Sequence, residues 1–435
     1  MMKFYDNPDK HTWKEILARP SKNAGELNEV VSAVLRDVRD NGDAALRKYE
    51  EQFDKAKLTE LRVSEAEFEE AEKAVPESLK EAINIAYADI RKFHEAQRFT
   101  PIRVETISGV VCEQRAVPIE RVGLYIPGGT APLFSTVLML AIPAKIAGCK
   151  EIVLCTPPDR NSRCNAAILY CAHLCGVSYV FKVGGSQAIA AMALGTESIP
   201  KVNKIFGPGN QYVVAAKQLV SLMDVAIDMP AGPSEVEVVA DVSSNPKFVA
   251  ADLLSQAEHG VDSQVVLVAT DKDIIKKVES EVEAQLQLLP RKDIAAKALS
   301  NSKAIYVPTK KDVIDISNAY APEHLVIATE DYQEIANGII NAGSVFLGPY
   351  SCESAGDYAS GTNHTLPTKG YAKAYSGLCL DSFMRKMTLQ HLSSKGVMSI
   401  GRAVEIMAEA EGLDAHKKAM TVRLDYVNRQ NSDIK

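Results

Sequence analysis

The chain has 435 residues, 46% of them hydrophobic and 24% charged, a composition typical of a globular protein with two or more lobes. Its formal net charge of −7 argues against a nucleic-acid partner, and no apolar run is long enough to span a membrane. The first residues carry no signal-peptide core and the 8 cysteines form no Cys-x-x-Cys pair, so we expect reduced thiols in a cytoplasmic enzyme.

The first hundred residues are predicted to be mostly helical. Residues 1–22 read as a polar N-terminal arm. Apolar residues recur with helical spacing from Leu27 to Val38, Ser64 begins a capping box, and a long helix is expected over 76–97. The apolar stripes of these helices need a partner surface, which we expect in residues 235–380.

Residues 121–234 alternate short apolar runs with helical segments, as in a parallel sheet covered on both faces. Three of the predicted strands run into glycine turns, at 127–130, 184–187 and 207–210. Glycine at the carboxyl end of a strand lets backbone N–H groups approach a phosphate. The Gly-x-Gly-x-x-Gly fingerprint is missing, so nucleotide binding and tight turns without a ligand both stay open.

A second alternating series follows from Val236, with strands expected at 236–239, 264–268, 304–307, 324–327 and 344–347. The predicted fold class is therefore α/β, with two Rossmann-like lobes built on parallel sheets and small helical segments at both ends. We expect one lobe to comprise 23–120 together with 235–380 and the other to comprise 121–234. Residues 381–435 are predicted to form a C-terminal helical segment without strands.

Three separated segments offer side chains that bind metals or move protons. Gln256 and His259 share one face of a predicted helix end, and Glu323 precedes His324 at a strand entry. Asp357 lies in a segment of small residues that allows close approach to a ligand. Each position also has a plain structural reading, such as a helix-capping imidazole, a surface carboxylate or a core histidine.

Several long segments together resemble the histidinol dehydrogenase family, and the resemblance runs essentially from end to end. They are Arg121–Gly129 (RVGLYIPGG), Phe206–Asn210 (FGPGN), Asp228–Ser234 (DMPAGPS), Ser255–His259 (SQAEH), Ala321–His324 (APEH) and Ser354–His364 (SAGDYASGTNH). The fold of this family is similar to that of the aldehyde dehydrogenases.

The resemblance implies oxidation of L-histidinol to L-histidine through bound L-histidinal, the last step of histidine biosynthesis. It implies two NAD⁺ per turnover, one Zn²⁺ per subunit, and a homodimer with shared active sites. Carried over by position, the catalytic pair is Glu323 and His324, and the zinc ligands are Gln256, His259, Asp357 and His416. The cofactor contacts are Tyr125, Gln187 and Asn210. The substrate contacts are Ser234, Gln256, His259, His324, Asp357, Glu411 and His416, with His364 expected near the substrate.

Two alternatives stay open from the residues alone. An aldehyde dehydrogenase-like route would need a nucleophilic thiol, for which Cys112, Cys149 and Cys155 are the candidates, although none has an evident activating neighbour. A non-enzymatic NAD-binding protein would leave the clustered acid, amide and imidazole side chains without a purpose. Because Glu411 and His416 lie in a tail with no sheet of its own, we expect this tail to cross a two-fold axis.

Overall fold

The structure is a computed structural model that describes residues 2–20, 24–128, 132–230 and 232–432. It divides into two compact units. The larger unit comprises residues up to 97 together with 119–383, and the smaller one comprises 98–118 together with 384 onward. Within the described ranges, no helix combines the length and apolarity needed to cross a bilayer.

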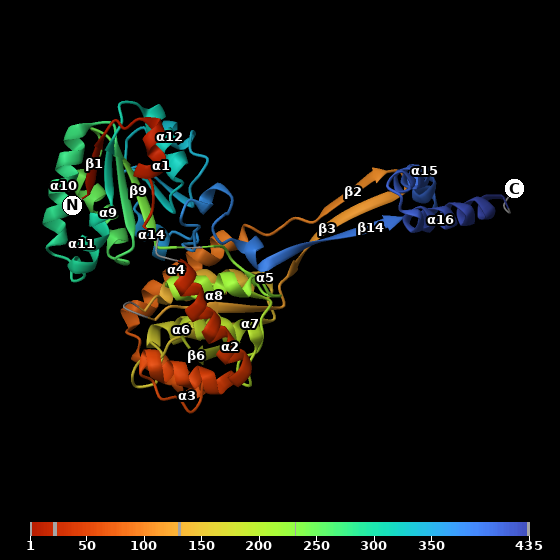
Figure 1. Ribbon diagram of the computed structural model, residues 1–435, viewed down its shortest axis with the longest axis horizontal. Helices are drawn as coiled ribbons and strands as arrows, with labels where there is room; N and C mark the ends of the chain where they lie inside the picture. The colour runs from red at the N-terminus through yellow and green to blue at the C-terminus, as the bar shows by residue number, and fades with distance from the viewer. Residues whose placement is uncertain (1, 21–23, 129–131, 231, 433–435) are drawn as a thin grey trace. The chain divides into compact units, whose positions relative to one another are not determined.

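The larger unit contains a parallel five-stranded sheet in the order β6-β5-β4-β7-β8. Figure 1 labels β6 in the lobe that also carries α2, α3 and α6. The chain enters at the middle strand β4 and later returns to the other side at β7, so the carboxyl ends of β4 and β7 flank the point where strand order reverses. The strands are β4 (Arg121–Tyr125), β5 (Glu151–Thr156), β6 (Tyr179–Lys182), β7 (Lys204–Phe206) and β8 (Ala226–Ile227). The crossover helices are α5 (Phe134–Ala147), α6 (Ala166–Leu174), α7 (Gly185–Leu194) and α8 (Gln211–Val220).

The N-terminal helices cover this five-stranded sheet, not the sheet of residues 235–380 as expected. Helix α2 packs on α7 and α8, α3 packs on α6, and α4 packs on α5. The reason is that α5 and α7 are apolar on almost every side and buried along most of their length, so they need a second layer of helices. The outer elements are α2 (Ala24–Tyr49), η2 (Glu50–Asp54), α3 (Glu65–Ala74) and α4 (Glu77–Glu95).

A parallel six-stranded sheet, in the order β1-β11-β10-β9-β12-β13, forms the other α/β lobe. Figure 1 labels two of its strands, β1 and β9. The described part of the predicted arm, residues 2–20, belongs to it, because β1 adds an edge strand and Leu17 is buried in its core. The strands are β1 (Lys3–Asp6), β9 (Glu235–Ala240), β10 (Gln264–Ala269), β11 (Lys303–Tyr306), β12 (His324–Ile327) and β13 (Ser344–Leu347). The helices are η1 (Lys10–Thr12), α1 (Trp13–Ile16), α9 (Pro246–Ala257), α10 (Lys272–Leu286), α11 (Lys292–Ser300), α12 (Lys310–Tyr320), α13 (Tyr332–Ala336) and α14 (Glu353–Tyr358).

Both sheets are thus parallel and carry buried apolar side chains on each face, which confirms the predicted α/β class. Two short 3₁₀ turns, η3 (Tyr371–Lys373) and η4 (Leu380–Phe383), follow the second lobe. The capping box expected at Ser64 is present, since its hydroxyl accepts from the Glu67 N–H and the Glu67 carboxylate accepts from the Ser64 N–H.

The smaller unit contains a three-stranded antiparallel ribbon and a helical hairpin, so the prediction that residues 381–435 lack strands is wrong. Met384 pairs with Pro118, and the pairing continues to Leu392 and Val110. The strand over Met384–Leu392 is exposed along most of its length, so its sequence lacks the regular alternation of apolar and polar residues that would signal a strand. The elements are β2 (Ile102–Ile107), β3 (Val110–Pro118), β14 (Met384–Leu392), α15 (Ser394–Ala410) and α16 (Asp414–Ser432).

Candidate active site

The candidate site lies at the amino ends of β9 and β12, the two strands between which the order of the six-stranded sheet reverses. His324 is the first residue of β12 and pairs with Val236, the second residue of β9. Glu323 immediately precedes β12, and its carbonyl oxygen accepts from Ser344 of the neighbouring strand. A Cβ atom on Gly343 would lie 2.5 Å from the Glu323 carbonyl oxygen, so only glycine permits this approach.

Glu323 and His324 lie together and are both buried. Glu323 Oε2 is 3.8 Å from His324 Nδ1, and it accepts a hydrogen bond from the Glu235 N–H at 2.9 Å. His324 Nδ1 lies 3.2 Å from the carbonyl oxygen of Glu235, the acceptor that a protonated Nδ1 would use. The opposite nitrogen, His324 Nε2, is buried without a hydrogen-bond partner and lies 3.6 Å from Asp357 Oδ1. The geometry therefore leaves Nε2 available as a proton acceptor.

A possible metal-binding group lies beside this pair. His259, Glu353 and Asp357 each offer one ligand atom, and these atoms lie within 4.8 Å of one another. His259 follows the last turn of α9, whereas Glu353 and Asp357 are one turn apart on the same face of α14. With its amide nitrogen turned toward Glu353, Gln256 donates to that carboxylate, and its oxygen accepts from the Glu235 N–H at 2.8 Å.

The site carries a surplus of negative charge around one imidazole. Burial alone would lower the pKa of His324, but the carboxylates of Glu353, Glu323 and Asp357 outweigh burial and raise that pKa to about 10. Burial raises the pKa of Glu323 to about 8, against the opposing effect of His324, and raises the pKa of Glu353 well above its usual range. One imidazole nitrogen and two carboxylate oxygens are metal ligands that suit a divalent cation such as Zn²⁺.

Three further predicted residues belong to the other lobe, near the carboxyl ends of its strands. Tyr125 ends β4, and its buried hydroxyl accepts from the Gly185 N–H at 3.1 Å. Gln187 is buried and donates from Nε2 to Glu50 Oε1 at 2.9 Å. Asn210 caps α8, with its side-chain oxygen accepting from the N–H groups of that helix start. Tyr125 thus holds the glycine turn at Gly185, and Asn210 holds the start of α8.

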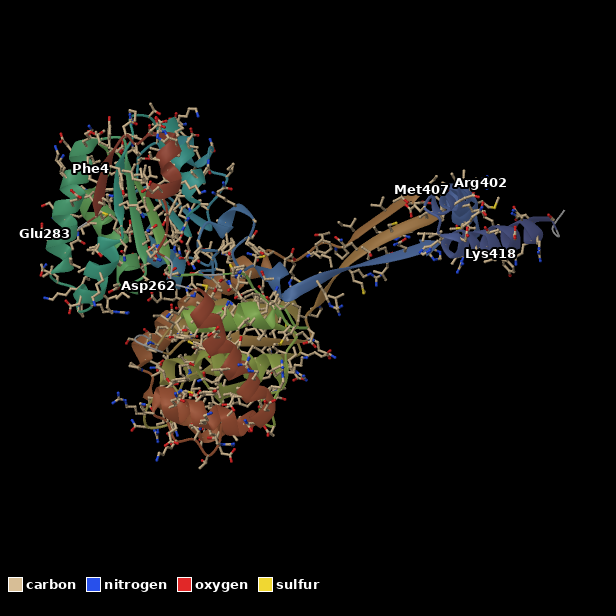
Figure 2. All side chains as sticks on the ribbon, viewed as in Figure 1. Phe4, Asp262, Glu283, Arg402, Met407 and Lys418 are labelled. Carbon is tan, nitrogen blue, oxygen red and sulfur yellow. The ribbon has the colours of Figure 1, made fainter. Side chains whose placement is uncertain are left out.

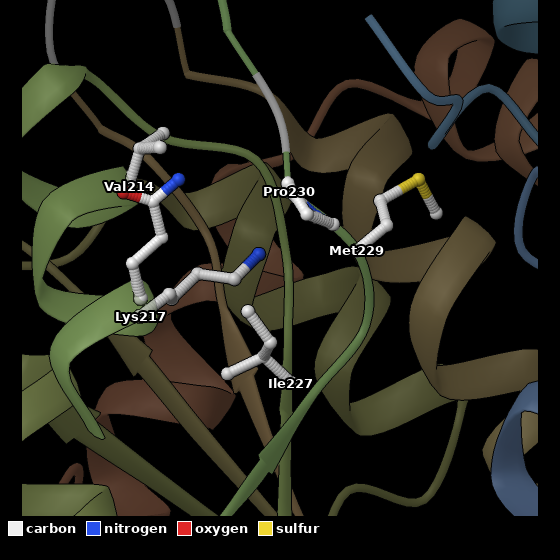
Figure 3. Close-up of a pocket in the computed structure, with 6 residues that line it drawn as sticks. Val214, Lys217, Ile227, Met229 and Pro230 are labelled. Carbon is white, nitrogen blue, oxygen red and sulfur yellow. The ribbon is translucent and has the colours of Figure 1, made fainter. Parts of the chain in front are cut away.

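A buried lysine, Lys217, stabilises the turn at Gly207 that follows β7. A Cβ atom on Gly207 would lie 2.1 Å from the Tyr125 carbonyl oxygen, so glycine is required where β7 passes β4. Lys217 donates to the Gly207 carbonyl at 2.8 Å and pairs with Asp228, which in turn accepts from the Gly207 N–H at 2.8 Å. Figure 3 shows Lys217 extending from α8 toward Met229 in a small hollow that both side chains help to line.

The remaining predicted residues lie in several places. Ser234 is half-buried directly before β9, and its carbonyl oxygen accepts from the Gln264 N–H. His364 is linked through Nδ1 to the Asp357 carbonyl oxygen at 2.9 Å. Glu411 and His416 belong to the smaller unit, at the end of α15 and in the first turn of α16, and both side chains are exposed. Gly129, Thr130 and Ala231 of the predicted turns lie outside the described residues.

Comparison with known proteins assigns the chain to a family. A sequence profile described as Histidinol dehydrogenase matches residues 17–424. The histidinol dehydrogenase of Bacteroides fragilis is 64% identical over 428 residues, which cover 98% of this chain and 100% of that protein.

The chain belongs to the histidinol dehydrogenase family.

Other members of the histidinol dehydrogenase family agree with this assignment. The Campylobacter jejuni protein of that name is 53% identical over 424 residues, covering 97% of this chain and 98% of the relative. The crystal structure of histidinol dehydrogenase from Elizabethkingia anophelis superposes with a TM-score of 0.96 at 55% identity, covering 98% of this chain and 99% of that one. The match over 17–424 includes every predicted site residue, from Tyr125 to His416.

The surroundings of the candidate cysteines bear on the thiol alternative. Burial raises the pKa of Cys149 to about 12 and raises the pKa of Cys155 as well, so both thiols stay protonated near neutral pH. A protonated, buried thiol is a poor nucleophile. Cys112 lies on β3 in the smaller unit, and all eight cysteines are free. The thiol route therefore gains no support from the environments of Cys149 and Cys155.

Sequence reasoning missed two acidic residues of the site. Glu353 was passed over although it stands four residues before Asp357, a spacing that places both carboxylates on one helical face. Glu235 was missed because it begins an apolar strand, where a charged residue gives no signal of its partner. Its peptide groups contact Glu323 and His324, while its carboxylate binds Arg19.

Proposed function

We propose that the protein oxidises L-histidinol to L-histidine through bound L-histidinal, with two NAD⁺ per turnover, as a zinc-dependent cytoplasmic homodimer. This is the last step of histidine biosynthesis. The observation that carries the proposal is the buried His324 imidazole, whose Nε2 has no hydrogen-bond partner and faces the possible metal-binding group. Family membership supports the choice of substrate.

The proposed metal ligands are Gln256, His259 and Asp357, with His416 of the partner subunit. Zinc held by these residues would supply a template that orients the substrate for hydride transfer. Part of the carboxylate charge that raises the pKa of His324 would be offset by a dication at His259 and Asp357. The imidazole can then accept a proton near neutral pH.

In the first oxidation, His324 accepts the hydroxyl proton of histidinol through Nε2 while hydride passes from the carbinol carbon to NAD⁺. The C–H bond breaks, a C=O bond forms, and the aldehyde stays bound. His324 now carries a positive charge 3.8 Å from Glu323. This charge lowers the pKa of Glu323 and favours the carboxylate form that can accept a proton from water.

In the second oxidation, Glu323 takes a proton from water while the water oxygen adds to the aldehyde carbon. His324 returns its proton to the aldehyde oxygen, which gives the hydrate and leaves the imidazole neutral. His324 then accepts a hydroxyl proton of the hydrate as the second hydride passes to a second NAD⁺, and the carboxylic acid product ionises to histidine. Tyr125, Gln187 and Asn210 are the proposed cofactor contacts, and Ser234 and the partner's Glu411 are proposed substrate contacts.

The smaller unit supports the proposal of a second chain. Its helical hairpin exposes apolar side chains, and Met407 is 65% exposed (Figure 2). Exposed apolar groups of this kind are typical of surfaces that bind another protein. The set comprises Met398, Ile406, Met407, Leu413, Val422 and Tyr426.

The proposed function is tested by product stoichiometry. Purified protein with L-histidinol and excess NAD⁺ should form two NADH for each histidine, measured by NADH absorbance and by chromatography of the amino acid. L-Histidinal should give one NADH for each histidine. One NADH per histidinol with accumulating aldehyde would contradict the four-electron reaction, and no NADH from either substrate would contradict the substrate assignment.

A further inference from the structure

A buried ion pair anchors the N-terminal segment to the first residue of β9. Arg19 Nε donates to Glu235 Oε1 at 2.6 Å, and Arg19 Nη2 donates to Glu235 Oε2 at 2.8 Å. The two side chains are only 18% and 3% exposed. A two-pronged guanidinium–carboxylate pair of this kind fixes both distance and orientation, which a single charge contact does not.

The main chain of the same glutamate holds the proposed catalytic pair. The Glu235 N–H donates to Glu323 Oε2 at 2.9 Å, and the Glu235 carbonyl oxygen lies 3.2 Å from His324 Nδ1. A proton shared with this carbonyl must reside on Nδ1, so the neutral ring presents its lone pair at Nε2. The position of one residue therefore sets both the orientation of Glu323 and the tautomer of His324.

Arg19 also holds the loop that leads into the pair. Its Nη2 donates to the Tyr320 carbonyl oxygen at 2.7 Å, and its guanidinium carbon lies 4.1 Å from the centre of the Tyr320 ring. Ala321 follows with a φ of 52°, a left-handed conformation that costs energy for a residue with a side chain. One guanidinium thus links the start of β9 to the turn that ends two residues before Glu323.

We propose that Arg19 is a positioning residue for the oxidation. It holds Glu235 and the Tyr320–Ala321 turn at a fixed separation, so that the peptide groups of Glu235 keep Glu323 and His324 in their reacting orientation. The inference rests on the proposed roles of Glu323 and His324. A purely structural role, in which Arg19 only attaches the N-terminal segment, is the alternative that the experiment must separate.

The experiment compares Arg19→Ala with a matched pair elsewhere in the chain. Arg121 forms the same two-pronged contact with Glu151, at 2.7 and 2.8 Å, at the amino end of β4. Arg121→Ala therefore removes an ion pair of the same two-pronged geometry, although a more exposed one, that does not touch Glu323 or His324. The readouts are kcat and KM on L-histidinol and L-histidinal, zinc content, and thermal unfolding, each with and without millimolar guanidinium chloride.

We expect Arg19→Ala to lower kcat on both substrates by about 10–100-fold, as for other groups that orient a reacting side chain, with little change in KM. Guanidinium should restore part of the lost kcat in Arg19→Ala and none in Arg121→Ala. Arg19→Lys should fall between wild type and Arg19→Ala, because an ammonium group cannot make the two-pronged contact.

Two outcomes would overturn the proposal. One is a wild-type kcat in Arg19→Ala, and the other is a loss of kcat that guanidinium does not relieve and that matches the loss in Arg121→Ala. If Arg19→Ala does not fold, Arg19→Lys and Glu235→Gln decide, because a kcat at wild-type level in both folded variants also contradicts positioning. His324→Asn is measured in parallel: if that variant keeps wild-type activity, the proposed role of His324 fails, whatever Arg19 does.

Discussion

His324 Nδ1 faces the carbonyl oxygen of Glu235 at 3.2 Å, while the opposite ring nitrogen is buried without a hydrogen-bond partner. This relationship defines which nitrogen can act as a base. We therefore expect His324→Asn to suppress the oxidation of histidinol and of histidinal alike, by about 10²–10⁴-fold in kcat. Steady-state kinetics on the two substrates is the measurement.

Substitution of Glu323 should affect the two oxidations unequally, unlike substitution of His324. Only the aldehyde needs activated water, so Glu323→Gln is expected to slow histidinal oxidation more than histidinol oxidation. The amide keeps an oxygen that can accept from the Glu235 N–H, which preserves the local hydrogen bond. Equal losses on both substrates would mean that Glu323 does not activate water.

The zinc content of purified variants should distinguish residues that bind the metal from residues that only lie near it. We expect a chelator to abolish activity and zinc to restore it. His259→Ala and Asp357→Asn should each weaken zinc binding by more than about 100-fold, beyond the usual effect of groups that only orient a ligand. Elemental analysis of the purified variants measures this.

Glu353→Gln is the informative comparison. Glu353 belongs to the same possible metal-binding group as His259 and Asp357, and its carboxylate also accepts a hydrogen bond from Gln256. If Gln256 is the ligand, as proposed, Glu353→Gln should retain most of its zinc. Zinc loss equal to that of Asp357→Asn would instead make Glu353 a ligand, and full activity in a verified metal-free protein would end the metal proposal.

Mixed dimers test the shared active site. If each site takes His259 from one chain and His416 from the other, both His259→Ala and His416→Ala homodimers should be inactive. After the two are refolded together in equal amounts, about half of the dimers should be mixed, and each mixed dimer carries one site free of both substitutions. Activity should then return to roughly a quarter of wild type by this counting.

The presence of mixed dimers must be verified by mass spectrometry. A refolded sample that contains mixed dimers and stays inactive would show that His416 serves its own chain. Wild-type protein carried through the same unfolding and refolding supplies the reference activity.

The pH dependence of stability should report on Glu237, which is buried in the middle of β9. Burial raises its pKa from 4.5 to about 8 in the folded chain, with an opposing hydrogen bond from Ser317. The folded protein therefore retains a proton that the unfolded chain releases. The resulting stabilisation is present below pH 4.5 and is lost as pH rises from about 4.5 to 8.

Glu237→Gln imitates the protonated acid and should flatten this dependence by on the order of 2–4 kcal/mol between pH 5 and pH 8. The measurement is the free energy of urea unfolding at the two pH values and at one protein concentration. Glu283→Gln, at an exposed position on α10, is the control and should follow wild type (Figure 2). Parallel curves for wild type and Glu237→Gln would contradict the assignment.

Local patterns in the sequence determined a large part of the fold. Every strand of the five-stranded sheet, and all those of the six-stranded sheet except β1, coincide with apolar runs recognisable in the sequence, because each run is short and bounded by turn residues. The capping box at Ser64 was likewise readable, since its partners are three residues apart. The family assignment also followed from contiguous segments such as Ser354–His364.

Only the tertiary structure decided which surfaces meet. The apolar stripe of α2 shows that this helix must pack against another surface. That surface is α7, whose apolar outer side the sheet leaves uncovered, and the sequence of α2 alone does not identify it. In the same way, the link from Arg19 to Glu235 joins residues 216 positions apart in the sequence. Periodicity and spacing describe one element at a time, whereas burial, ion pairing and pKa depend on groups that folding brings together from distant parts of the chain.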